Sequence, residues 1–284
     1  MVKIAHKSRN FSTFACGDEV VAVHAQRRSL SINKADKMIE MSQIKIQEVD
    51  VNLWNKYKVR FIPHSDVNII VGINGSGKTT LLSAMEKNLA KKIGKAGRYI
   101  YIPSVDNLVV KDGRKKANAL SQDLDSYLYD MKTGPSLMFY RMSILDASAS
   151  FQSKIKERIE NFCDVVNTLF EDTGKFVELE GNKFIINADG EILNTDDLSS
   201  GEKQILLMLL RVFLLDEKES IILIDEPENS LDISWQYKLI DLFVKLNPNA
   251  QFFITTHSPS IFGNGWGDKI IYMEDVTSKI DQTL

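Results

Sequence analysis

This 284-residue chain has no long apolar run, only two cysteines and little excess of either charge. The longest apolar stretch, Ile205 to Leu215, is interrupted by Arg211 and is shorter than the roughly 20 residues that a membrane-spanning helix needs. We therefore expect no direct membrane insertion. The two cysteines, Cys16 and Cys163, have neither metal-site spacing nor enough partners for a disulfide framework, which predicts a reducing, cytoplasmic location.

The charge balance excludes a strong overall attraction to nucleic acid. The net charge is -3 at pH 7, and the isoelectric point is about 5.9. A basic stretch, Lys111 with Arg114 to Lys116, keeps nucleic acid open as a partner, although a solvated loop is the favoured interpretation. The chain shows no repeat, heptad array or low-complexity segment, and its 44% of apolar residues is ample for a globular core.

The first 37 residues differ in character from the rest of the chain. They carry seven lysines or arginines against three acids, show no sustained periodicity, and are followed by Met38. The favoured interpretation is a disordered leader or an upstream start, and the alternative is a basic arm that contacts a partner or nucleic acid. Residues 38–284 are expected to form a single domain.

Buried strands alternate with helices along residues 38–284. Strands are predicted at VNIIV (67–71), RYIYIPS (98–104), IILID (221–225), FFITT (252–256) and KIIYM (269–273), and helices at 78–93, 199–215 and 233–246. This order predicts an α/β fold with a mostly parallel sheet. The alternating segments IKIQEVDV (44–51) and VRFI (59–62) predict an additional antiparallel pair.

An inserted, partly helical lobe is expected at about residues 105–197. Apolar residues recur at spacings of three and four from Phe151 to Phe170, which predicts an amphipathic helix. Residues 175–193, KFVELEGNKFIINADGEIL, contain alternating runs separated by Gly-Asn and Asp-Gly, which predicts hairpins.

The segment GINGSGKT, Gly72 to Thr79, matches the pattern GxxxxGK[ST] between a predicted strand and a predicted helix. Its glycines let backbone N–H groups face phosphates, and the helix N-terminus adds partial positive charge. Lys78 is expected to neutralise the phosphates during catalysis, and Thr79 to place its hydroxyl on Mg²⁺. The predicted nucleotide-binding residues here are Asn74, Gly75, Ser76, Gly77, Lys78, Thr79 and Thr80.

Two further strand ends carry candidate catalytic side chains. Asp225 and Glu226 stand at the end of a buried strand, and ligand sites of such sheets lie at the carboxyl ends of strands. Asp225 is expected to hold Mg²⁺, while Glu226 is a candidate general base for the attacking water. His257 ends the next strand and is placed to contact the γ-phosphate, although a lone histidine there is more often structural.

The stretch LSSGE, residues 198–202, fits the SxxE capping box of a buried helix. A capped helix start with serine hydroxyls and a glycine is also an anion site. Ser199, Ser200, Gly201 and Glu202 are therefore candidate phosphate ligands, and local chemistry leaves open whose phosphate they meet.

Five segments together resemble a known family. GINGSGKT, LSSGEKQ, IILIDEP, SLD (230–232) and ITTHS stand in the order of the Walker A, signature, Walker B, D-loop and H-loop motifs of ABC-type ATPases, over roughly residues 43 to 275. Glu202 stands where transporter ATPases usually have Gln, and LSSGE with THSP is similar to SMC-like, RecF-like and OLD-like proteins. Among these, the chain looks most like the compact ATPases that accompany a separate effector in bacterial antiphage and retron-type systems.

The resemblance implies an ATPase that works as a head-to-tail homodimer or a larger assembly. Ser199 and Gly201 would contact the γ-phosphate held by Lys78 of the partner subunit, and Asp232 would line the interface. ATP would join the two subunits, and hydrolysis would release them. The implied partner is a separate effector, a nuclease or toxin, because coiled-coil arms are absent and few residues follow Met273.

The chain departs from the family pattern in two places, and two other functions stay open. No Q-loop is assigned, because Gln122 and Gln152 both fall in the expected lobe, and Trp54 and Tyr57 are adenine-stacking candidates by position only. The alternatives are the ATP-binding subunit of an ABC membrane transporter and a RecF-like DNA repair ATPase.

Overall fold

The computed structural model describes residues 44–93, 98–105, 116–132, 135–145, 147–181 and 183–280. The predicted leader, Cys16 and all of the basic stretch except Lys116 lie outside these residues. The chain divides into two units, Met1–Ile44 and Lys45–Leu284, and the fold described below is that of the second unit.

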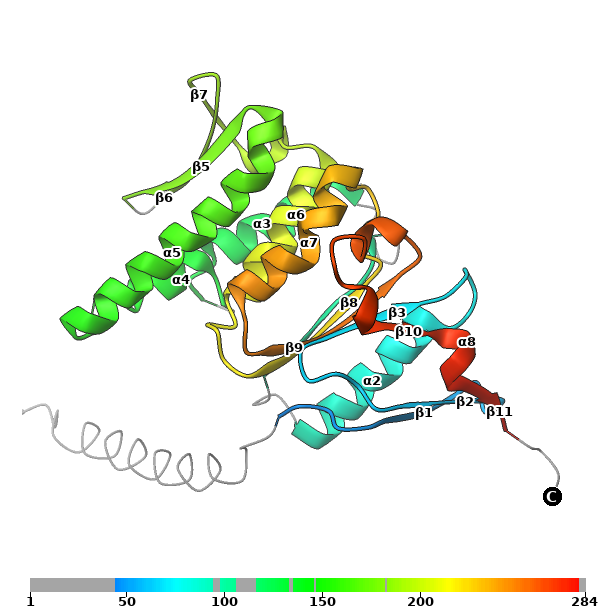
Figure 1. Ribbon diagram of the computed structural model, residues 1–284. Coiled ribbons are helices and arrows are strands. Elements are labelled where there is room, and N and C mark those ends of the chain that lie inside the picture. Colours follow the sequence, from blue (N-terminus) through cyan, green and yellow to red (C-terminus); the bar gives the residue numbers. More distant parts are fainter. Residues whose placement is uncertain are drawn as a thin grey trace, which may run out of the picture. The chain divides into compact units, whose positions relative to one another are not determined.

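A five-stranded parallel sheet forms the centre of this unit, in the order β10-β3-β9-β8-β4 (Figure 1). Its strands are β3 (Val67–Val71), β4 (Tyr99–Ile102), β8 (Ser220–Asp225), β9 (Ala250–Thr256) and β10 (Ile270–Tyr272), and every neighbouring pair is parallel. All residues of β8 and β9 are buried, as expected for parallel strands covered on both faces. The predicted α/β fold with a mostly parallel sheet is confirmed.

Helices cover both faces of this sheet (Figure 1). Helix α2 (Lys78–Ile93) lies between the central sheet and a second, antiparallel sheet. On the other face, α6 (Ser200–Phe213) and α7 (Ile233–Leu246) pack side by side, and their apolar residues share one core with those of β8 and β9. None of the helices in the described residues is long and apolar enough to cross a membrane.

The antiparallel sheet consists of β1 (Val49–Leu53), β2 (Tyr57–Phe61) and β11 (Thr277–Lys279), which confirms the predicted antiparallel pair. Strand β1 begins at Val49, so the prediction that it starts at residue 44 is wrong. The reason is a tertiary contact: the Gln251 side chain binds both the N–H and the C=O of Ile46, at 2.8 and 3.1 Å.

In the described residues between β4 and α6 there are three helices and three strands. They are α3 (Lys116–Tyr129), α4 (Leu137–Met142), α5 (Ala149–Phe170), β5 (Lys175–Glu180), β6 (Lys183–Ala188) and β7 (Glu191–Leu193). The predicted helix and hairpins are confirmed, but Phe151 is 48% exposed and does not join the buried face. It lies in the first turn of α5, before the helix reaches the core at Ile155. The boundaries of the lobe stay a prediction.

The remaining described elements are short. They are α8 (Met273–Val276) and the 3-10 turns Glu171–Thr173, Thr195–Asp197, Pro259–Ile261 and Gly267–Lys269.

Candidate functional site

The loop between β3 and α2 has a backbone that requires glycine at two positions. Gly75 and Gly77 have φ angles of +82° and +95°, a region that L side chains rarely adopt. A Cβ on Gly77 would also lie 2.9 Å from the Trp54 ring, so this aromatic residue packs directly on the loop. Asn74 and Gly75 are exposed at its tip, while the Ser76 hydroxyl is buried without a hydrogen-bond partner.

Lys78 and Thr79 begin α2 and point at two carboxylates at the carboxyl end of β8. The buried Lys78 ammonium donates to the Gly72 carbonyl at 2.8 Å and lies 3.4 Å from Glu226 Oε1. The Thr79 hydroxyl donates to Asp225 Oδ1 at 3.1 Å. Thr80 belongs to the same first turn of α2. The structure thus brings together the side chains that the sequence predicted at two separate strand ends.

Asp225 is a buried carboxylate, and only one of its two oxygens accepts hydrogen bonds. Its Oδ1 also accepts a hydrogen bond from Thr255 Oγ1 at 2.6 Å, whereas Oδ2 is buried and has no hydrogen-bond partner. Burial raises the pKa of Asp225, Glu226 adds to the rise, and the hydroxyls of Thr255 and Thr79 oppose it.

This oxygen set fits Mg²⁺. Mg²⁺ prefers one or two protein oxygens together with substrate phosphates and water, so Thr79 and Asp225 would suffice to hold it. No group of three or more His, Cys, Asp or Glu side chains suited to a metal occurs in the described part of the chain. A magnesium site here would accordingly depend on the phosphates of a nucleotide.

Glu226 has a strained backbone. Its φ is +46°, and its N–H donates to both the carbonyl and the hydroxyl of Thr255, at 3.0 and 3.2 Å. Non-glycine residues in this region cost about 1–3 kcal/mol and tend to cluster at functional sites. The strained turn directs the partly exposed Glu226 carboxylate to a point near Lys78 and Asn229.

His257 lies just beyond β9, with its imidazole 45% exposed. Its Nδ1 is 3.6 Å from Glu226 Oε1 and 3.3 Å from Glu228 Oε1. The two candidate catalytic groups, Glu226 and His257, therefore lie next to each other at the carboxyl edge of the sheet.

Sequence reasoning missed three polar residues at this edge. Ser104 follows β4 and accepts a hydrogen bond from Asn229 at 3.0 Å, and Asn229 in turn lies 3.5 Å from Glu226 Oε2. Glu228 is buried beside His257. The segment DEPEN and the position of Ser104 after a buried strand were the signals available. Neither glutamine considered for a Q-loop takes this place, since Gln152 lies on α5 and Gln122 on α3.

The start of α6 forms the predicted capping box. Glu202 N donates to Ser199 Oγ at 3.2 Å, and Ser199 N donates to Glu202 Oε2 at 2.8 Å. The other Glu202 oxygen pairs with Lys175 at 2.9 Å. Burial alone would raise the pKa of Glu202, but the bonds from Lys175 and Ser199 outweigh it and lower that pKa. Glu202 is therefore engaged inside the chain, while Ser199 and Ser200 are exposed.

Gly201 lets α6 approach the loop that precedes α7. A Cβ at this position would lie 2.5 Å from the carbonyl oxygen of Ser230, which itself has a φ of +67°. The exposed Asp232 caps α7 by accepting from Ser234 N at 2.8 Å. Within the described residues, no hydrogen bond or ion pair joins residues 199–202 to the glycine loop at 72–80.

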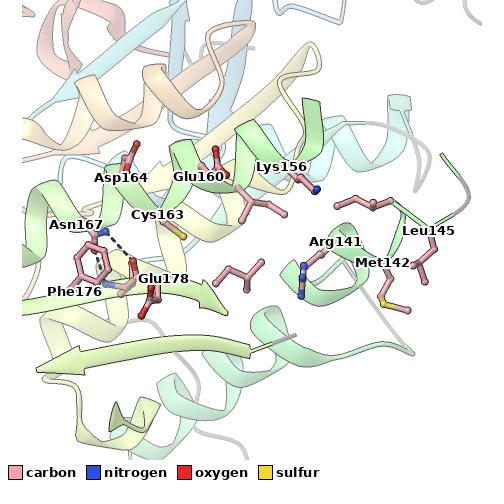
Figure 2. Close-up of a pocket in the computed structure, with 14 residues that line it drawn as sticks. Arg141, Met142, Leu145, Lys156, Glu160, Cys163, Asp164, Asn167, Phe176 and Glu178 are labelled. Carbon is pink, nitrogen blue, oxygen red and sulfur yellow. Dashed lines mark hydrogen bonds between the residues drawn. The ribbon is translucent and has the colours of Figure 1, made fainter. Parts of the chain in front are cut away.

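A separate cavity of about 480 Å³ lies between α4, α5 and β5 (Figure 2). Lys156 and Glu160 from α5, Arg141 from α4, and Phe176 from β5 line it, and none of the residues described above at the sheet edge or at the start of α6 takes part. Burial raises the pKa of the Cys163 thiol in its wall to about 12, so the thiol stays protonated at neutral pH.

The arrangement defines a class of protein. A glycine loop at a helix start, a buried lysine, a Thr–Asp pair and a strained glutamate all meet at the carboxyl edge of a parallel sheet. This is the architecture of a P-loop nucleotide hydrolase.

Two families match the chain. The P-loop domain of ABC ATPases matches residues 33–174, half of the chain, and the family described as "AAA domain, putative AbiEii toxin, Type IV TA system" matches residues 108–263. The chain belongs to both families and is an ABC-type P-loop ATPase, which binds and hydrolyses ATP.

Individual relatives are distant. The "Probable siderophore transport system ATP-binding protein YusV" of Bacillus subtilis is 24% identical over 66% of this chain, which spans 58% of the length of YusV. The "Phosphonates import ATP-binding protein PhnC" of Lactobacillus gasseri is 21% identical over 85% of this chain and 83% of its own length. Among solved structures, an SmcHead bound to the C-winged helix domain of ScpA is similar, with 16% identity, coverage of 80% and 96%, and a TM-score of 0.48.

Proposed function

We propose that this ATPase forms a head-to-tail homodimer, or a larger assembly, when it binds ATP, and thereby regulates a separate effector in the cytoplasm. The effector is a nuclease or toxin, and the setting is antiphage defence or nucleic-acid surveillance. The description of the second matched family, which names the AbiEii toxin and a Type IV TA system, supports this setting.

The observation that carries the dimer is the position of the signature serines. Ser199 and Ser200 are exposed at the N-terminus of α6, where partial positive charge favours an anion, and within the described residues no hydrogen bond joins them to their own glycine loop. In the proposed dimer, Ser199 and Gly201 meet the γ-phosphate held by Lys78 of the partner subunit. Asp232, at the exposed end of the neighbouring loop, lines the same interface.

Within one subunit, different residues have different roles in ATP hydrolysis. Backbone N–H groups of the glycine loop and the Lys78 ammonium bind the β- and γ-phosphates. Glu226 accepts the proton of the attacking water, and His257 contacts the γ-phosphate. Thr79 and Asp225 would hold Mg²⁺, which would neutralise charge on the phosphates.

Mixing two defective subunits tests the shared site. Lys78→Ala destroys the glycine-loop half, and Ser199→Arg blocks the signature half, so each variant alone should be inactive. Mixed dimers contain one intact site out of two, and random pairing recovers at most about a quarter of the wild-type sites. The matched control mixes Lys78→Ala with the double variant Lys78→Ala/Ser199→Arg, which leaves no intact site. Recovery equal to this control would contradict the dimer.

The ATP-binding subunit of a membrane transporter is the second candidate, because YusV and PhnC are named as ATP-binding proteins of transport systems. Purification of the native protein with its partners, followed by mass spectrometry, separates the two. A nuclease or toxin whose activity changes with ATP supports the effector, and a permease supports the transporter.

A further inference from the structure

Glu228 is a buried carboxylate that none of the roles above uses. Its side chain is 3% exposed. Oε1 accepts hydrogen bonds from Thr256 Oγ1 at 2.6 Å and from His257 N at 3.0 Å, whereas Oε2 is buried without a hydrogen-bond partner. A buried carboxylate costs free energy unless its charge is compensated, so stability alone gives no reason for an acid here.

The same carboxylate faces the imidazole of His257. Glu228 Oε1 lies 3.3 Å from Nδ1, closer than the 3.6 Å to Glu226 Oε1. A histidine whose Nδ1 is held by a carboxylate has a defined ring orientation, and only its Nε2 remains for another ligand. A ring that donates from Nδ1 to Glu228 and from Nε2 to a phosphate oxygen carries two protons and bridges two anions.

The loop around His257 is held on both sides. Thr256 Oγ1 accepts from Ser258 N at 2.9 Å, and Ser258 Oγ donates to the Gln236 side chain of α7 at 2.7 Å. The backbone is therefore fixed by several bonds, while the exposed imidazole has only the Glu226 and Glu228 carboxylates beside its Nδ1, at 3.6 and 3.3 Å. These two tasks of Glu228, as a hydrogen-bond acceptor and as a charge, can be separated by substitution.

We propose that Glu228 is a positioning residue for ATP hydrolysis: it holds His257 Nδ1 so that Nε2 is presented to the γ-phosphate. The inference rests on the contact proposed between His257 and that phosphate. Glu228 itself touches neither ATP nor the attacking water.

Glu228→Gln tests the charge while it keeps the acceptor. The amide has the same size, and its oxygen can still accept from Thr256 and His257 N, so the loop is preserved. We expect kcat to fall about 10- to 100-fold, as when a carboxylate behind a metal-binding histidine is lost. The KM for ATP and the melting temperature should stay near their wild-type values. Glu178→Gln, an exposed carboxylate of β5, is the matched control and should behave as wild type.

The decisive measurement is a double-mutant cycle with His257→Ala. If Glu228 acts through the imidazole, the double variant Glu228→Gln/His257→Ala is no slower than His257→Ala alone. Factors that multiply would overturn the proposal, as would a wild-type kcat for Glu228→Gln. Glu228→Asp retains the charge and should keep more activity than Glu228→Gln. If Glu228→Gln lowers the melting temperature and its activity follows only the folded fraction, the role is structural and the proposal fails.

The same variants distinguish a failure of this inference from a failure of the proposed contact between His257 and the γ-phosphate, on which it rests. A wild-type rate for His257→Ala removes the proposed phosphate contact and Glu228 with it. A slow His257→Ala beside a normal Glu228→Gln removes the role of Glu228 alone.

Discussion

The carboxyl edge of the central sheet and the packing of α4 on α5 both bury charged side chains, but they treat them differently. In the second region, Arg158 donates to Tyr140 Oη at 2.9 Å and to the Phe213 carbonyl at 3.2 Å, and it pairs with Glu217. Tyr140 Oη in turn donates a hydrogen bond to Asp216 Oδ1 at 2.8 Å. This network locks the end of α6 to α4 and α5.

The sheet edge, by contrast, buries two carboxylate oxygens that make no hydrogen bond. Asp225 Oδ2 and Glu228 Oε2 have no hydrogen-bond partner, whereas Arg158 Nη1, which also lacks a hydrogen bond, is paired with the Glu217 carboxylate. Backbone strain does not separate the two regions, because Glu226 has a positive φ and so do Asp216 and Glu217. Such features cost stability and persist where surrounding structure supports them, as at ligand sites. The Arg158 network thus pairs its buried charge within the fold, whereas the edge leaves two buried oxygens unpaired, which is consistent with the ATP site proposed above.

Among the substitutions that test this comparison, Glu226→Gln at the sheet edge should have the largest effect. Loss of the proposed general base is expected to slow ATP hydrolysis by roughly 10²- to 10⁴-fold, while ATP binding and assembly are retained. Steady-state hydrolysis and equilibrium nucleotide binding measure the two effects. Glu217→Gln, in the Arg158 network, is the control and should lower stability without slowing catalysis. Normal turnover by Glu226→Gln would mean that another group is the base.

Gly201→Ala should have the next largest effect. Its Cβ would lie 2.5 Å from the Ser230 carbonyl, and a backbone atom gives way less easily than a side chain. Overpacking of this kind costs about 1–3 kcal/mol of unfolding free energy, which exceeds the gain in helix propensity from alanine. Gly267→Ala, with no heavy atom within 4 Å, is the control in urea unfolding. Equal midpoints for the two variants would contradict the close approach.

Tyr140→Phe should lower the unfolding free energy by about 1–2 kcal/mol, because Arg158 and Asp216 lose a buried partner. Burial and the bond to Asp216 raise the pKa of Tyr140 to about 12. A raised pKa stabilises the fold below pH 10, and this contribution is lost as pH rises through 12. Urea unfolding at increasing alkaline pH should therefore be less pH-dependent in Tyr140→Phe. Cys163 titrates in the same direction, so Cys163→Ala serves as the common background.

The smallest effect is expected at Phe151. Because it is half exposed, Phe151→Ser should change the unfolding free energy by less than about 0.5 kcal/mol. Ile155→Ala, one turn further along α5, should cost about 2–5 kcal/mol because Ile155 is fully buried. Similar losses of unfolding free energy in the two variants would mean that Phe151 belongs to the apolar face of α5, as the sequence predicted.

Elements with strong local signals were predictable from the sequence. The strand Val67–Val71 and the helices Lys78–Ile93 and Ile233–Leu246 lie where apolar runs, spacing and caps indicated. The nucleotide loop and the two strand-end carboxylates were also recognised, because parallel strands bring their carboxyl ends to one edge. Strand β1 was misplaced because the side chain of Gln251, far along the chain, binds Ile46.

The sequence by itself determined the order of elements and the residues that meet at the proposed ATP site, because periodicity, caps and glycine spacing are local. Only the tertiary structure decided that Glu202 faces Lys175, 27 residues away, and that Glu228 faces the backbone of His257, 29 residues away. It also decided that Gly201 makes room for the Ser230 carbonyl. These contacts join separate elements, and their geometry follows from how α6, α7 and β9 pack around one core.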